Sequence, residues 1–448
     1  MRLQTRKLLD KAFSGLGLIA IAIMALALLM ILTPIVWRGS KAFIFKGTIE
    51  HRRVILEQFD RGNPDKFNQE SAQAAAARAP IYQMMEAFEV EMKEMKSSDR
   101  REYKAAYKEV EKNIKVLLGP IPGERTPVLL RQQYGQTRWG RTLLKLHEVL
   151  FSEEWDYSNA DTMGVLLEKP RIDAFTDTQL EPLFGYLEKH MVEMMLPKTT
   201  FYGQFITDKS KDSHIFGGIW PEVLGTLYLT LGAMIFAIPS GVVAAIYLCE
   251  YAREGKLISF IRICISTLAG VPSIVFGLFG LAFFLNTIHV SDSKSVLAGS
   301  LTLSLLILPT IIRSSEEAIL AVPRAYKEAA LGLGAGRWHT VLTVILPAAL
   351  PGILTGIVIS MGRAAGETAP IIFTAAVSAG APLKIWETLN QPTPALPWNI
   401  YNLCTEHEAV DEIRHVQYGM VLTLIAIVLL LNLFAILMRA RISKKLRG

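Results

Sequence analysis

The sequence predicts an all-α integral membrane protein, with six transmembrane helices and a large, mainly helical extracytoplasmic insertion. The 448-residue chain is 51% hydrophobic and has a mean hydropathy of +0.31, which is high for a soluble globular protein. Six charge-free runs are long enough to cross the membrane, because a helical span needs about 20 mainly apolar residues. A long polar segment, about 38–214, separates the first run from the second.

Each predicted span is bounded by charged or titratable residues. The first differs from a signal peptide, because its apolar stretch is about twice the usual 7–15 residues and no small-residue cleavage site follows it. We therefore expect residues 1–37 to form a basic tail and a retained first helix. The fourth run is the shortest of the six. The runs lie between Lys11 and Arg38, Glu222 and Glu250, Arg262 and Asp292, Lys294 and Arg313, Arg337 and Arg363, and His415 and Arg439.

Lysine and arginine are concentrated in alternate connecting segments, and basic residues favour the cytoplasmic side of a membrane. Both termini are therefore expected in the cytoplasm. The net charge of +6 follows largely from this asymmetry, so no nucleic-acid partner is predicted. The three cysteines have no paired or metal-like spacing, so we expect no metal site. The inner segments hold Arg2, Arg6, Lys7, Lys11, Arg253, Lys256, Arg262, Arg313, Arg324, Lys327, Arg337, Arg439, Arg441, Lys444, Lys445 and Arg447, and the short outer loops hold Lys294, Lys384 and Arg414.

The insertion contains two segments with apolar residues at spacings of three and four, which predict amphipathic helices. The stretch Ser97-Ser98-Asp99 between them is expected to form the turn of a helical hairpin. The stripes of Met and aromatic residues indicate core packing. A docking surface for an extracytoplasmic binding protein is the alternative. The stripes are Ile81, Met85, Phe88, Met92 and Met95, then Tyr103, Tyr107, Val110, Ile114 and Leu117.

The third predicted span contains the sequence Gly270-Val271-Pro272-Ser273. Proline removes a backbone donor from a helix, and glycine allows close helix approach, so a kink packed within a bundle is expected there.

A glycine-rich stretch lies between the fourth and fifth spans. Pro323 suits the first turn of a short helix, and three glycines that follow allow the chain to end the helix and reverse. The stretch contains neither a phosphate-binding loop nor a dinucleotide-binding fingerprint, so this chain is not expected to bind ATP. An ordinary connector is the alternative. The apolar helix face is Tyr326, Ala329, Ala330 and Leu333, and the glycines are Gly332, Gly334 and Gly336.

Residues 328–347 resemble the EAA loop of ABC-importer permeases, E-A-A-x3-G-x9-I-x-L-P. Val344 stands at the isoleucine position. The resemblance implies a MetI-like permease core at 215–448, and a coupling loop at about 313–347 that docks onto a separate ATPase. The implied coupling residues are Glu328, Ala329, Ala330, Gly334, Leu346 and Pro347.

From about 200 to 448 the chain resembles phosphate-importer permeases of the PstA type. This implies a non-enzymatic subunit of the bacterial inner membrane that works with a second permease (PstC type), a cytoplasmic ATPase dimer (PstB type) and a periplasmic phosphate-binding protein (PstS type). It implies no cofactor in this chain, with ATP and Mg²⁺ bound by the ATPase, and contact with membrane lipid. The family pattern does not explain the insertion. The matching motifs are Gly270–Gly277, Leu308–Ser314 and Gly362–Pro370 followed by IIFTA.

Phosphate import requires a positive or hydrogen-bonding group at depth in the membrane, and Arg363 is the candidate. On the fifth helix Gly352, Gly356, Ser360, Arg363 and Glu367 share one face, so the two charged residues are expected to point into the bundle.

Pro370 predicts a break just after Glu367, beyond which a new half-helix would offer free N–H groups to an anion. The resemblance assigns Arg363, Glu367 and Thr368 to the substrate pathway. One alternative is that Arg363 and Glu367 form a buried pair that only fixes packing. Another is that they lie at the outer interface, where arginine can snorkel.

Three other functions remain open from the residues. A permease for sulfate or another oxyanion would share the same loop. An ion-coupled secondary transporter would show paired repeats and broken helices at mid-membrane. A signalling or structural membrane protein would use the insertion as its working part.

Overall fold

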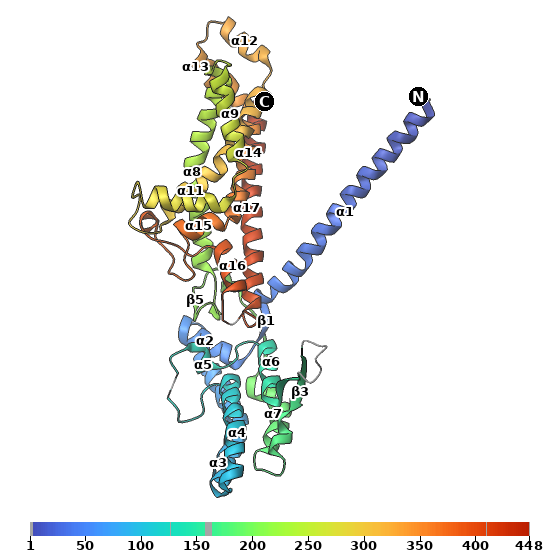
Figure 1. The fold of residues 1–448 in the computed structure, drawn as a ribbon, viewed down its shortest axis with the longest axis vertical. Helices are drawn as coiled ribbons and strands as arrows, with labels where there is room; N and C mark the ends of the chain where they lie inside the picture. Colours follow the sequence, from blue (N-terminus) through green and yellow to red (C-terminus); the bar gives the residue numbers. More distant parts are fainter. Residues whose placement is uncertain (1–2, 126, 157–163, 409, 448) are drawn as a thin grey trace. The chain divides into compact units, whose positions relative to one another are not determined.

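The computed structural model describes residues 3–125, 127–156, 164–408 and 410–447. The chain forms two compact units (Figure 1). We call Met1–Ala42 with Gln204–Gly448 the membrane unit, and Phe43–Gly203 the inserted domain. The bounds of the inserted domain lie inside the polar segment 38–214 recognised in the sequence.

The inserted domain is built mainly from helices, and most of them share one apolar core. Both predicted amphipathic stripes face this core, with Phe88 and Ile114 among the residues that are fully buried. The predicted turn is wrong by two residues: the break falls at Met95 and Lys96, and the second helix already begins at Ser97. Small polar and acidic residues favour the first turn of a helix, which explains this shift. The helices are α2 (Ile49–Phe59), α3 (Pro64–Glu94), α4 (Ser97–Leu118), α5 (Leu130–Tyr134), α6 (Trp139–Leu150) and α7 (Glu181–Met195).

Within the residues that the structure describes, three small antiparallel sheets accompany the helices. Strands β1 (Ile44–Gly47) and β4 (Lys198–Phe201) pair where the chain enters and leaves the inserted domain. The domain also contains a hairpin, and a third pair lies in the membrane unit just before its second span. The hairpin is β2 (Phe151–Asp156) with β3 (Val165–Pro170), and the third pair is β5 (Ser210–Lys211) with β6 (Phe216–Gly217).

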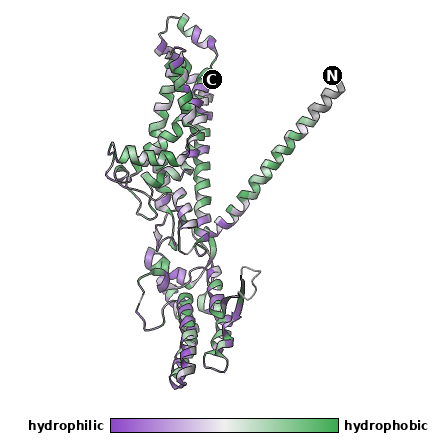
Figure 2. Cartoon of the chain, viewed as in Figure 1, coloured by the Kyte–Doolittle hydropathy of each residue, from purple (hydrophilic) through white to green (hydrophobic). Residues whose placement is uncertain are grey.

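Five helices of the described chain are long and apolar enough to cross a membrane, and a bent pair makes a sixth span if it is counted as one. Figure 2 shows the predominance of apolar residues along these helices. The predicted helical membrane fold is confirmed, with six spans if the bent pair counts as one. The five are α1 (Leu3–Phe43), α8 (Trp220–Ile246) continued by a π-helical turn (Tyr247–Tyr251), α11 (Val296–Leu320), α13 (Arg337–Thr340) running through a π-helical turn (Val341–Ile345) into α14 (Leu346–Gly366), and α17 (Arg414–Arg447).

The bent pair is the third predicted span. Helix α9 (Lys256–Leu268) and α10 (Ser273–Gly280), which continues as a π-helical turn to Leu285, meet at an angle of 101°. The bend falls at the Gly270–Pro272 stretch, as predicted, but it is a complete break and not a kink. Pro272 has no N–H for a helix to use, so it becomes the N-cap residue of α10.

The membrane unit also contains the short helices α15 (Ala369–Thr374) and α16 (Leu396–Thr405). The two short elements that follow helix breaks, α10 and α15, pack directly on each other. A Cβ added at Gly277 of α10 would lie 2.9 Å from the Ala369 carbonyl oxygen, so only glycine allows this approach. The central core lies between α8, α11 and α14 and includes Leu229, Ala233, Leu303, Ile307, Ile311 and Ala364.

Candidate functional site

The fifth span ends at the predicted position. Helix α14 stops at Gly366, Glu367 has extended backbone angles (φ −77°, ψ 129°), and α15 begins at Ala369. Pro370 has no N–H to bond the Gly366 carbonyl, which prevents the helix from continuing. The predicted break after Glu367 is therefore confirmed. Anion binding at the start of α15 stays a prediction.

Arg363 and Glu367 form an ion pair across the last turn of α14. The Arg363 Nε donates to the Glu367 Oε1 at 3.3 Å. The Arg363 side chain is 38% exposed and the Glu367 side chain is 19% exposed. The predicted inward orientation therefore describes Glu367 better than Arg363, which keeps much of its surface uncovered in the single chain. Thr368 follows as the residue between the two helices and is partly buried.

The small residues earlier on this face of α14 pack against α11. A Cβ at Gly352 would lie 2.7 Å from the Ala318 Cβ, and one at Gly356 would lie 1.9 Å from the Ser314 Oγ. Ser360 is fully buried. Close packing at these positions fixes α14 against α11 just before the helix reaches Arg363.

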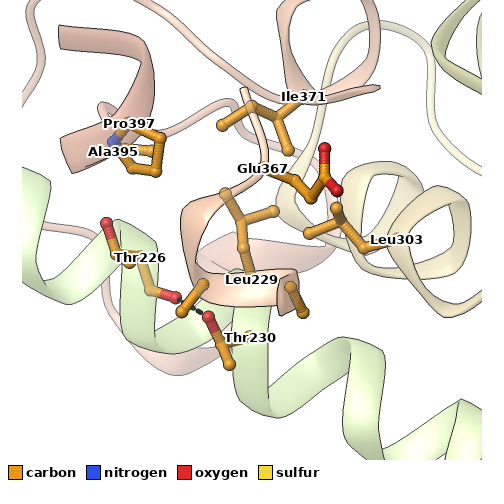
Figure 3. A pocket seen from close by; sticks show the side chains of 10 residues that line it. Thr226, Leu229, Thr230, Leu303, Glu367, Ile371, Ala395 and Pro397 are labelled. Atoms are coloured by element: carbon orange, nitrogen blue, oxygen red, sulfur yellow. Dashed lines mark hydrogen bonds between the residues drawn. The ribbon is translucent and has the colours of Figure 1, made fainter. Parts of the chain in front are cut away.

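A small pocket opens beside Glu367 (Figure 3). The Thr226 hydroxyl donates to the Glu222 carbonyl and accepts from the Leu396 N–H, and the Thr230 hydroxyl donates to the Thr226 carbonyl. The cavity measures about 10 Å³, which is room for roughly one water molecule. Phosphate does not fit this pocket in the present conformation. Its lining is Thr226, Leu229, Thr230, Leu303, Ala364, Ala365, Glu367, Ile371, Ala395 and Pro397.

The sequence reasoning missed the threonines of this pocket. Thr226 and Thr230 lie four residues apart on one face of the apolar span α8. That spacing was a visible signal, but hydroxyls commonly bond the carbonyl four residues back in a membrane helix, as these do. Their position opposite Glu367 depends on how α8 and α14 pack.

The glycine-rich stretch forms an exposed helix and a turn. Helix α12 (Arg324–Gly332) has Pro323 at its N-cap and contains no buried residue among its nine described residues. The chain reverses at Gly334, whose φ of +86° favours glycine. Glu328 and Ala329 are exposed, and Ala330 is partly buried.

The six predicted coupling residues divide into two groups. Four belong to α12 and its turn, whereas Leu346 and Pro347 begin α14. Leu346 packs against the apolar cluster that joins α8, α11 and α14. The loop is therefore exposed at its helix and firmly packed where it enters the fifth span. Tyr326, Leu333 and Trp338 add exposed apolar surface to the same segment.

The described residues of the membrane unit form a multi-pass helical bundle with a broken span and an exposed helix between two spans. Residues 237–448 match the family model described as "Binding-protein-dependent transport system inner membrane component". Helix α1, the inserted domain and the first part of α8 lie outside that match.

Curated relatives agree with this match. A probable ABC transporter permease protein, YqgI of Bacillus subtilis, is 36% identical over 54% of this chain and 85% of the relative. Phosphate transport system permease proteins of the PstA type are similar too. The protein from Mycobacterium tuberculosis is 34% identical over 52% of this chain and 72% of its own length, and that from Yersinia pestis is 36% identical over 49% and 71%.

The chain therefore belongs to the permease family of ABC transporters, among the relatives of the PstA-type phosphate transport permeases. It is a multi-pass membrane component of an importer and not itself an enzyme. Among solved structures, the MetNI methionine ABC transporter is similar at 18% identity with a TM-score of 0.39, over 50% of this chain and 94% of that chain.

Proposed function

We propose that this chain is a permease subunit of an ATP-driven importer for inorganic phosphate. It lines the pathway together with a second, related permease of the PstC type. A cytoplasmic ATPase dimer of the PstB type binds ATP and Mg²⁺, and an extracytoplasmic binding protein of the PstS type delivers phosphate. In this arrangement both termini lie in the cytoplasm and the inserted domain lies on the opposite side of the membrane.

The exposed helix α12 supports the coupling part of this proposal. It carries Glu328, Ala329 and Ala330, and it joins spans α11 and α14 through the turn at Gly334. An uncovered helix between two packed spans is suited to transmit force from a second protein. ATP binding would draw the coupling helices together and open the cavity outward, and hydrolysis would reset it.

The phosphate assignment rests on the similarity to phosphate transport permeases and on the charged end of α14. Arg363 supplies a permanent positive charge whose planar guanidinium suits an oxyanion. Glu367 holds that guanidinium at 3.3 Å. Thr368 follows at the break and completes the proposed pathway residues.

Uptake of radiolabelled phosphate in phosphate-starved cells tests this function, with sulfate uptake as the control for substrate. Cells carry the wild-type chain, the Arg363→Gln variant or no permease. We expect phosphate-selective uptake that depends on the permease and is lost in the variant at equal membrane abundance. Selective uptake of sulfate would instead establish a permease for another oxyanion.

A further inference from the structure

Two shielded carboxylates lie where α8, α9, α11 and α12 come together. Glu250, in the π-helical turn that ends α8, is 12% exposed, and Glu316 of α11 is 11% exposed. Each carboxylate pairs with a cation from a different element. Lys327 of α12 binds Glu250, and the Nη2 of Arg262 on α9 lies 3.4 Å from the Glu316 Oε1. The family motif of the coupling loop includes neither pair.

The two pairs belong to one cluster. Cys249 is next to Glu250 in the chain, and its Sγ lies 3.9 Å from the Glu316 carbonyl oxygen. Arg262 also donates to the Leu248 carbonyl at 3.2 Å, so it bridges the end of α8 and Glu316 of α11.

The elements that supply the cations are weakly packed. Neither α9 nor α12 has a buried residue, and both are fully described. Polar contacts hold α9 at two positions along the helix. One is the Arg262–Glu316 pair, and the other lies one turn further on, where Arg313 of α11 donates to the Ser266 Oγ of α9 at 2.9 Å. For α12, the Lys327 ammonium reaches back to Glu250. The position of these two helices therefore depends on charge pairing more than on apolar packing.

Charge pairing of a shielded carboxylate is hard to break. Removing one partner leaves an uncompensated charge in a poorly solvated place, which costs more than the pair contributes. If α12 moved away from the end of α8, Glu250 would lose the ammonium that neutralises it. Keeping Glu250 paired therefore favours movement of α12 together with the end of α8, and Arg262 of α9 contacts both the end of α8 and Glu316 of α11.

We propose that the Lys327–Glu250 and Arg262–Glu316 pairs form a transmission joint, through which movement of the coupling helix α12 reaches α8, α9 and α11. The four residues are positioning residues. They do not contact the substrate. This inference rests on the proposed function, in which α12 is the element that docks onto the ATPase.

The test uses the whole transporter reconstituted in proteoliposomes and measures phosphate transported per ATP hydrolysed. Lys327→Glu and Glu250→Lys are each expected to lower this ratio by about tenfold. The interaction energy between two residues of a salt bridge typically changes an equilibrium constant by about that factor. The double variant restores the pair in reverse and should recover most of the ratio. Lys256→Glu, a charge reversal at an exposed lysine of α9, is the matched control.

A double variant with Lys327→Gln and Glu250→Gln covers the case in which single reversals fail to fold. It removes both charges and leaves none unpaired, so we expect an assembled transporter with a lowered ratio. The proposal would be wrong if this variant transported as much phosphate per ATP as the wild type, or if the charge-swapped double variant did not recover. Failure of the proposed function is seen separately, as a wild-type chain that does not copurify with the ATPase.

Discussion

Gly356 of α14 and Ser314 of α11 lie so close together that a Cβ at position 356 would sit 1.9 Å from the serine Oγ. The contact lies between the coupling loop, which precedes α14, and the ion pair at its end. The glycine backbone of α14 therefore packs directly on the serine side chain of α11, along the route that joins the proposed docking helix to the proposed pathway. Three of the predictions below concern this membrane unit, and the fourth concerns the inserted domain.

Gly356→Ala should destabilise the membrane unit by about 1–3 kcal/mol, the usual cost of overpacking a close contact. Thermal unfolding of the purified chain measures the loss. Ser314→Gly in the same chain should restore stability, because it removes the atom that clashes. Gly17→Ala is the control, since a Cβ at Gly17 meets nothing within 4 Å. Equal stability of Gly356→Ala and Gly17→Ala would contradict the close contact.

Arg363→Gln should abolish most phosphate uptake and leave the complex assembled. The change removes the charge at the end of α14 while keeping a side chain of similar length. Uptake and copurification of the partner subunits are measured on the same membranes. Loss of assembly instead of uptake would show that the Arg363–Glu367 pair serves only to fix the packing of α14.

Glu328→Lys should weaken copurification of the ATPase and lower uptake, without changing the preference for phosphate over sulfate. The carboxylate is exposed on α12, so its loss does not disturb the fold of this chain. Glu254→Lys, at an exposed carboxylate outside α12, is the matched control. Wild-type uptake with Glu328→Lys would remove this residue from the coupling role.

His51 should make the inserted domain sensitive to acid. Burial, together with Arg138 and Arg52, lowers the pKa of His51 from 6.5 to about 3. The folded domain therefore favours the neutral ring, which packs edge-on against Phe45 at 5.0 Å. The unfolded chain takes up the proton more readily than the folded domain does. The contribution of neutral His51 to the free energy of unfolding is therefore fully present above pH 6.5. As the pH is lowered from 6.5 towards 3, the free energy of unfolding decreases by about 1.4 kcal/mol per pH unit.

Hydrogen exchange of the α2 amides, followed between pH 7 and pH 4, measures this loss. His51→Gln should flatten the pH dependence of protection after correction for the intrinsic exchange rate. A slope unchanged by the substitution would assign the acid sensitivity to another group.

Much of the membrane fold could be predicted from the sequence, because spans and breaks follow from local chemistry. Charge-free runs located the spans, Pro272 and Pro370 located two interruptions, and Gly334 located the turn after α12. The sequence did not predict the 101° angle between α9 and α10, or the small sheets. These depend on contacts between distant segments, such as β1 with β4.

The candidate site was predicted only in part. The Arg363–Glu367 pair follows from a spacing of four residues on a helix. The pocket beside Glu367 brings Thr226 of α8 next to Ala395, which precedes α16, and no periodicity within one segment connects these positions. The Lys327–Glu250 pair likewise depends on how α12 folds back towards the end of α8.

The break between α9 and α10 has a consequence for how the chain enters the bilayer during synthesis. At 1.5 Å per residue, α9 and the continuous stretch Ser273–Leu285 are each about 20 Å long, short of the roughly 30 Å of hydrocarbon. Neither is a complete signal for membrane insertion. Helix α10 packs against α15, where Gly277 faces Ala369 and Pro370, residues that the ribosome makes later. The contacts of α10 with α15 therefore form only after the fifth span and the break after it have emerged.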